Sequence, residues 1–79
     1  MPRYFFDVDD GRNERDEEGF ECANHQAAVR CAKEALPAIA ADEVPRDGER
    51  QALTVLISDE EGRAVYVGTL TFTGTWLLR

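Results

Sequence analysis

The chain has 79 residues, of which 16 are acidic and nine are basic, so its formal net charge is −7. A chain of this length forms one domain with a single small core. The acidic balance and the single lysine argue against direct binding to nucleic acid, which needs clustered basic side chains. No apolar run approaches the roughly 20 residues that span a bilayer. The first residues have no signal-peptide pattern, so we expect a cytoplasmic protein without membrane contact.

Residues 2–8 predict the first strand. Tyr4, Phe6 and Val8 alternate with other residues and give this strand one strongly apolar face. Phe5 makes the opposite face partly apolar as well, which is typical of a strand inside a sheet.

The next segment, residues 9–21, is polar apart from Phe20. Two acidic turns, at 9–11 and 16–19, each end in glycine, a residue that takes a positive φ at no steric cost. We therefore expect a short polar ribbon between the first strand and the helix, and a fourth, short strand fits between residues 12 and 21.

Residues 24–41 predict one helix, with Asn24 as a good N-cap because its side chain can accept from first-turn amides. Pro37 removes one backbone donor, so we expect either a kink there or a break with Pro37 opening a final short turn. An exit loop follows at 42–48. The apolar positions recur at spacings of three and four and form one stripe: Ala28, Val29, Ala32, Leu36, Ile39 and Ala40.

Residues 51–58 and 64–72 predict two strands joined by a type I turn with a following bulge at 59–62. If Asp59 pairs with Arg63, a regular register brings the β-branched and leucine side chains onto one face, which the helix should cover. That register places Ile57 opposite Val65, Val55 opposite Val67 and Leu53 opposite Thr69. It leaves Leu56, Tyr66 and Leu70 on the other face.

The predicted fold class is α+β: an antiparallel sheet of three main strands, with or without the short fourth, and one helix packed on one face. Residues 1–79 form a single small domain in which 73–79 is an apolar C-terminal tail. The expected core consists of Tyr4, Phe6, Ala28, Ala32, Leu36, Ile39, Leu53, Val55, Ile57, Val65 and Val67.

Several of these segments match the pattern of a known family. They are the opening run at 1–8, the turns at 10–11 and 16–19, the alanine-rich helix and the hairpin turn at 59–62. Over residues 1–72 the chain resembles an uncharacterised family, a domain of unknown function found in short acidic bacterial proteins that open with Met-Pro-Arg-Tyr-Phe-Phe. The resemblance implies no catalytic residue, cofactor or partner.

Cys22 and His25 are the catalytic candidates. A helix N-terminus stabilises a thiolate, and a nearby histidine can act as its base. No other motif of a cysteine enzyme accompanies them, so we favour a small buried thiol and an exposed histidine. Cys31 lies nine positions after Cys22, most of them helical, so we expect two reduced thiols rather than a disulfide. His25 and Cys31 also lie about 120° apart around the helix, which argues against zinc.

An acidic cluster is the candidate for a metal site. Counting from Asp7, glycine falls at the fifth position rather than the sixth, so the spacing departs from that of a calcium-binding loop. We favour solvated turns and expect no cofactor and no metal. The candidate ligands are Asp7, Asp9, Asp10, Asn13 and Glu18.

Apolar residues outside the core pattern are the main indication of function. On the predicted register the sheet face away from the helix is too apolar for plain solvent surface, and the tail adds a tryptophan and two leucines. The tail either contacts another chain or folds back on its own domain. We expect two copies to bury these faces against one another as a homodimer. The expected interface residues are Phe5, Leu56, Tyr66, Leu70, Trp76, Leu77 and Leu78.

Three functions follow from these features. The first is a non-catalytic protein-protein interaction module that self-associates or docks on a partner. The second is an acidic regulator that masks a basic surface of a nucleic-acid-binding protein. The third is a small cysteine-dependent enzyme or redox protein. Ionic strength separates the first two, because charge masking weakens steeply with salt and apolar association does not.

Overall fold

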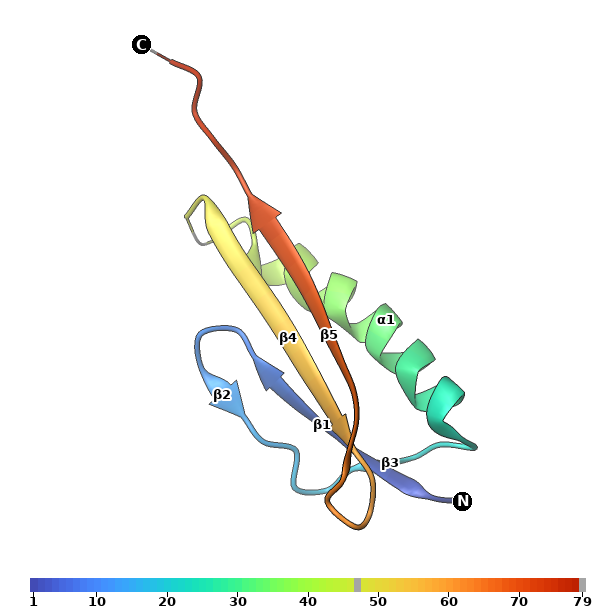
Figure 1. The fold of residues 1–79 in the computed structure, drawn as a ribbon. Helices are drawn as coiled ribbons and strands as arrows, with labels where there is room; N and C mark the ends of the chain where they lie inside the picture. Colours follow the sequence, from blue (N-terminus) through green and yellow to red (C-terminus); the bar gives the residue numbers. More distant parts are fainter. Residues whose placement is uncertain (47, 79) are drawn as a thin grey trace.

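A computed structural model of the chain describes residues 1–46 and 48–78. Asp47 of the expected exit loop and Arg79 of the expected tail lie outside the described residues. The elements follow in the order β1 (Arg3–Asp9), β2 (Asn13–Glu14), β3 (Phe20–Glu21), α1 (His25–Glu43), β4 (Arg50–Ser58) and β5 (Ala64–Thr73) (Figure 1).

The strands form one antiparallel sheet in the order β2-β1-β4-β5, and β3 pairs with the start of β1. The single helix of the described residues packs on one face of this sheet (Figure 1). The predicted α+β fold is therefore confirmed. The segment expected to hold one short strand, residues 12–21, instead contributes two strands of two residues each.

The helix begins where the sequence predicts. The side chain of Asn24 accepts a hydrogen bond from the amide of Ala27 at 2.8 Å, which satisfies one of the free amides of the first turn. The helix continues through Pro37 to Glu43, so of the two alternatives at Pro37 the break is wrong. Ala28, Ala32 and Leu36, spaced four residues apart, turn their side chains to the sheet and are buried.

The core lies between α1 and β4. Every second residue of β4 is buried beneath the helix, and Leu53 and Ile57 are almost completely enclosed. Of the expected core, Phe6, Ile39 and Val65 are only partly buried, and Val67 is wrong because 60% of it is exposed. The buried apolar residues are Tyr4, Cys22, Ala28, Ala32, Leu36, Leu53, Val55 and Ile57.

The β4–β5 register corrects the prediction for β5. The amide of Asp59 donates to the carbonyl of Arg63 at 2.9 Å, so the predicted turn is confirmed. The ladder then shifts between Ile57 and Ser58, which inserts one extra residue, Val65, into β5. Beyond this bulge Ile57 faces Tyr66, Leu53 faces Leu70, and Leu56 faces Val67.

Opposed residues of an antiparallel pair share a face of the sheet. The bulge therefore moves each β5 side chain that follows it to the face opposite the predicted one. Tyr66 and Leu70 lie on the helix side of the sheet, and Val67 lies on the uncovered side beside Leu56. The prediction that Tyr66 and Leu70 belong to the uncovered face is therefore wrong. A single extra residue in a strand is enough to reverse every side chain that follows.

The ribbon between β1 and α1 is held by the carboxylate of Asp16. Its oxygens accept from the amides of Phe6, Glu18 and Gly19 at 2.9–3.1 Å, while its own amide donates to Asp7. Burial by itself would raise the pKa of Asp16, but the three amide donors and the charge of Arg3 outweigh it and hold that pKa below its ordinary value. Asp16 thus supplies the hydrogen-bond acceptor that a neighbouring strand would otherwise offer to the Phe6 amide of β1.

Candidate functional site

β5 forms an open edge of the sheet. It pairs with β4 along its length, and within the described residues no strand pairs with its other side. At the opposite side of the sheet, β1 is flanked by β2 and bonded to Asp16. An unpaired edge presents a row of free amides and carbonyls to any strand that approaches it.

The same segment carries no charge. Residues 64–78 contain no Asp, Glu, Lys or Arg, whereas the whole chain has 16 acidic and nine basic residues. Large apolar side chains are exposed along it, including Val67 at 60%, Phe72 at 43% and Trp76 at 74%. We call residues 64–78 the uncharged segment.

The tail, residues 74–78, continues β5 away from the body of the domain (Figure 1). The amide of Gly74 donates to the carbonyl of Glu49 at 2.7 Å, and beyond this bond Trp76, Leu77 and Leu78 are 74%, 88% and 82% exposed. The described chain has a radius of gyration of 14.5 Å, against about 12 Å for a compact domain of this length. The tail therefore does not fold back on its own domain.

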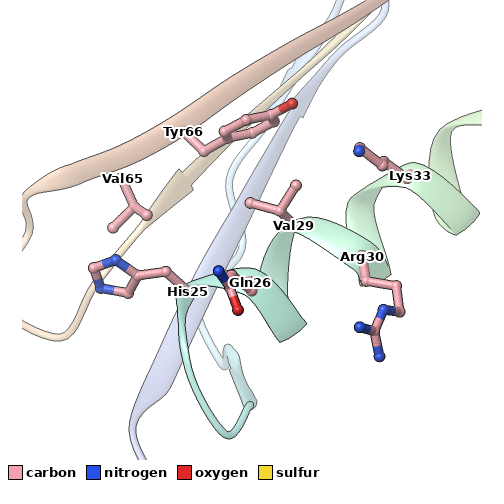
Figure 2. Close-up of a pocket in the computed structure, with 7 residues that line it drawn as sticks. All are labelled: His25, Gln26, Val29, Arg30, Lys33, Val65 and Tyr66. Carbon is pink, nitrogen blue, oxygen red and sulfur yellow. The ribbon is translucent and has the colours of Figure 1, made fainter.

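A groove runs between α1 and β5 beside this open edge. Its first hollow, of about 420 Å³, lies at the start of the helix, and Figure 2 shows the Tyr66 ring above Val29 with Lys33 to one side. A second hollow of about 240 Å³ continues past Leu36 and Leu70. We call the two hollows together the α1–β5 groove. The first is lined by His25, Gln26, Val29, Arg30, Lys33, Val65 and Tyr66.

The structure divides the expected interface residues into three groups. Phe5 and Leu56 lie on the uncovered sheet face. Tyr66 and Leu70 line the α1–β5 groove. The third group, which lies in the extended tail, is Trp76, Leu77 and Leu78.

Cys22 and His25 are not brought together. Cys22 is buried and lines an apolar hollow that faces β1, whereas His25 lines the α1–β5 groove and packs edge-on against Tyr4 at 5.6 Å between ring centres. Burial raises the pKa of the Cys22 thiol, and the neighbouring Cys31 raises it further. A raised pKa disfavours the thiolate that a nucleophile needs.

Both cysteines are free thiols, Cys22 buried and Cys31 exposed. They line the same apolar hollow, of about 440 Å³, together with Phe6, Phe20 and Ile39. Its lining comes mainly from β1, β3 and α1.

The acidic candidates serve the turns of the ribbon. Asp7 accepts from the amide of Asp16, Asp9 from that of Gly11, and Asp10 from that of Arg12. The carbonyl of Glu18 accepts from the Arg3 side chain at 2.8 Å. Within the part of the chain that the structure describes, no three His, Cys, Asp or Glu residues converge as metal ligands.

The helix side of the α1–β5 groove was missed from the sequence. Val29 belongs to the apolar stripe, and Arg30 and Lys33 flank it, so nothing in their spacing separates them from core and solvent positions. The sequence feature that could have indicated this site is the uncharged segment, because a run of 15 uncharged residues is unusual in so acidic a chain.

Comparison with known proteins gives a family. A family model described as Domain of unknown function (DUF6894) matches residues 3–71. The chain belongs to this family. The match covers all the strands and the helix except the last residues of β5, and it leaves the tail outside. The chain matches no curated protein and no solved structure. In residues 1–46 and 48–78, no helix combines the length and the hydropathy needed to cross a membrane.

Proposed function

We propose that this member of the DUF6894 family is a non-catalytic protein-interaction module that self-associates, or docks on another chain, through β5 and its tail. The observation that carries the proposal is the uncharged segment, which combines an unpaired strand edge with the exposed side chains of Trp76, Leu77 and Leu78. Exposed apolar patches beside free backbone groups are typical of binding surfaces. We expect a homodimer as the form of self-association.

The apolar surface is large enough to drive such an association. Burying a tryptophan side chain removes about 150–250 Å² from water, worth about 4–6 kcal/mol at 25 cal/mol per Å². A buried leucine adds about 1.5–3 kcal/mol. One tryptophan and two leucines from each of two copies therefore supply roughly 14–24 kcal/mol. Association costs about 4–15 kcal/mol in lost freedom and more in ordering the side chains, so the apolar term is of the size that a dimer needs.

Sedimentation equilibrium from low to high micromolar concentration tests the proposal. We expect the mass to rise from that of the 8.9 kDa chain toward twice that value, and we expect the association not to weaken as salt rises. Trp76→Ala should weaken the association, and Trp76→Phe, which keeps an aromatic ring, should retain most of it. A mass of 8.9 kDa at every concentration would contradict self-association.

The charge of the chain supports the second function, an acidic regulator that masks a basic surface of a nucleic-acid-binding protein. The net charge is −7, and exposed carboxylates gather in the turns, as at Glu17, Glu18, Glu60 and Glu61. Binding of this kind loses affinity steeply as salt rises. The same mass measurements, made with an added basic protein across a salt series, distinguish it from apolar docking.

A cysteine-dependent enzyme is the third function and has the least support. The raised pKa of Cys22 and the placement of His25 in a different hollow weigh against it. As part of the proposal we place the protein in the cytoplasm, because unpaired thiols suit a reducing compartment.

A further inference from the structure

Within the described residues, the part of β5 from Tyr66 to Thr73 lacks the features that normally prevent edge-to-edge pairing. Natural sheets protect their edges with charged side chains, prolines, bulges along the edge, or a covering segment. Between Tyr66 and Thr73 the strand has no charge, no proline and no bulge, and its bulge lies nearer the turn at Val65. β5 is ten residues long, and its part beyond the bulge offers a template for another strand.

We propose that the occupant of this edge is β5 of a second copy, paired antiparallel about Thr71, with Trp76 of each copy seated in the α1–β5 groove of the other. This inference rests on the proposed function, which it deepens by naming the partner and the contact. The sheet would then continue through both copies, with both helices on the same face, as a two-fold axis perpendicular to the sheet requires.

The charge distribution leaves one uncharged surface on which a second copy can approach this edge. Each copy carries −7, so two copies repel one another except where they meet through an uncharged surface. The uncharged segment, 64–78, is such a surface, and its middle residue is Thr71. Pairing about Thr71 overlaps the segment with itself along its full length and leaves Arg63 outside.

This register also places side chains from the same face of the sheet opposite one another. Opposed residues must share a face, and Tyr66 and Leu70 lie on the helix side. Alternation along the strand adds Gly68 and Phe72 to that side. Pairing about Thr71 sets Leu70 against Phe72 and Tyr66 against Trp76. On the uncovered side it sets Thr69 against Thr73, a cross-strand threonine pair of the kind already formed within the domain by Thr54 and Thr69.

The α1–β5 groove of a second copy would bury the Trp76 side chain, which is exposed in a single copy. Its ring is 74% exposed in the tail, whereas Tyr66, which it would oppose, forms a wall of the first hollow. Val29 supplies apolar contact on the helix side of that hollow (Figure 2). The cationic side chains of Arg30 and Lys33 also line it, and a cation above an indole face is attracted to the ring.

A cysteine placed on the two-fold axis tests this register. In the full chain with Cys22→Ala and Cys31→Ser, Thr71→Cys would bring two thiols onto directly opposed positions, where Cα atoms lie about 4.5–5.5 Å apart and a disulfide can form. Oxidised glutathione supplies the oxidant: two thiols lose two protons and two electrons, and glutathione disulfide becomes two glutathione thiols. Thr69→Cys is the matched control, because two copies of residue 69 would lie four residues apart, about 14 Å.

We expect a covalent dimer from Thr71→Cys and none from Thr69→Cys, with circular dichroism confirming that both variants fold. We also expect Trp76→Ala to raise the dimer dissociation constant about tenfold or more, as for an interface anchor, and the single tryptophan's emission to shift to shorter wavelength as the dimer forms. A dimer that cross-links through Thr69→Cys and not through Thr71→Cys would overturn this inference and leave the proposed self-association through β5 standing. A dimer that is dissociated by Leu56→Glu on the uncovered face but not by Trp76→Ala would overturn both this inference and the proposed route through β5 and the tail. A monomer at all concentrations would overturn both.

Discussion

Replacing Gly19 by alanine should destabilise the domain far more than the same change at another turn glycine. Gly19 has φ of +74°, and a Cβ at this position would lie 2.8 Å from the backbone oxygen of Tyr4, 2.9 Å from Arg3 Cγ and 3.0 Å from Phe5 Cε2. Gly62 is the matched control, because its φ of +81° is nearly the same and a Cβ there would meet no heavy atom within 4 Å. The two variants share the cost of the left-handed backbone and differ in the clash.

The magnitudes follow from these contacts. An alanine in the left-handed region costs about 1–2 kcal/mol, and this should be the whole loss of unfolding free energy for Gly62→Ala. Forcing an extra methyl group into a packed site costs about 1–3 kcal/mol more. At Gly19 the closest atom is the backbone oxygen of Tyr4 in β1, which cannot move without disturbing the pairing of β1 with β3. We therefore expect Gly19→Ala to lose about 2–5 kcal/mol.

Urea denaturation followed by circular dichroism measures both losses. A chain of this length has a total stability of roughly 4–12 kcal/mol, so the larger loss is a substantial part of it. It should also lower the melting temperature by about 4–8 °C for each kcal/mol. Equal losses of unfolding free energy for Gly19→Ala and Gly62→Ala would show that the ribbon does not pack against β1 as described.

Three further predictions concern single side chains. The folded pKa of Asp16 lies below its ordinary value of 3.8, so its contribution to stability is present at neutral pH and is lost as pH falls through the folded pKa. Asp16→Asn should lower the unfolding free energy by about 1–3 kcal/mol at neutral pH. In urea titrations at decreasing pH, this variant should also lose less stability than the unmodified protein. Iodoacetamide should alkylate Cys31 well before Cys22, since Cys22 is buried and its pKa is raised, and equal rates by mass spectrometry would contradict this. Asn24→Ala should lower the unfolding free energy by about 1 kcal/mol through loss of the helix cap, whereas Asn24→Ser should lose little.

The helix and the two long strands of the hairpin could be predicted because local sequence decides them. Asn24 lies directly before a stripe of apolar residues with helical spacing, and its side chain caps the helix in the structure. The turn at Asp59 is also local, and its predicted pairing with Arg63 is confirmed. These features depend on neighbours a few residues away along the chain, which is the range over which spacing and turn chemistry act.

The contacts of the ribbon between β1 and α1 could not be predicted from local sequence. The sequence predicts a solvated turn at Asp16, yet its carboxylate reaches the amide of Phe6, ten residues away, and links β1 to the turn before β3. Nothing in the acidic run distinguishes Asp16 from Glu17 and Glu18 beside it. The distinction arises only when the chain folds back and brings one carboxylate against unpaired amides.

The bulge at Val65 has the widest consequence for function. With a regular ladder, Tyr66 and Leu70 would join Leu56 on the uncovered face and favour face-to-face assembly. In the structure that face keeps Leu56 and Val67, but it also carries the bonded threonines Thr54 and Thr69.

The extra residue instead turns Tyr66 and Leu70 into the α1–β5 groove, directly beside the open edge. Exposed apolar surface, free backbone groups and the absence of charge therefore meet along β5 rather than on the broad face of the sheet. A surface of that shape is suited to another strand, because a strand can satisfy the edge amides and bury the adjoining side chains in one contact.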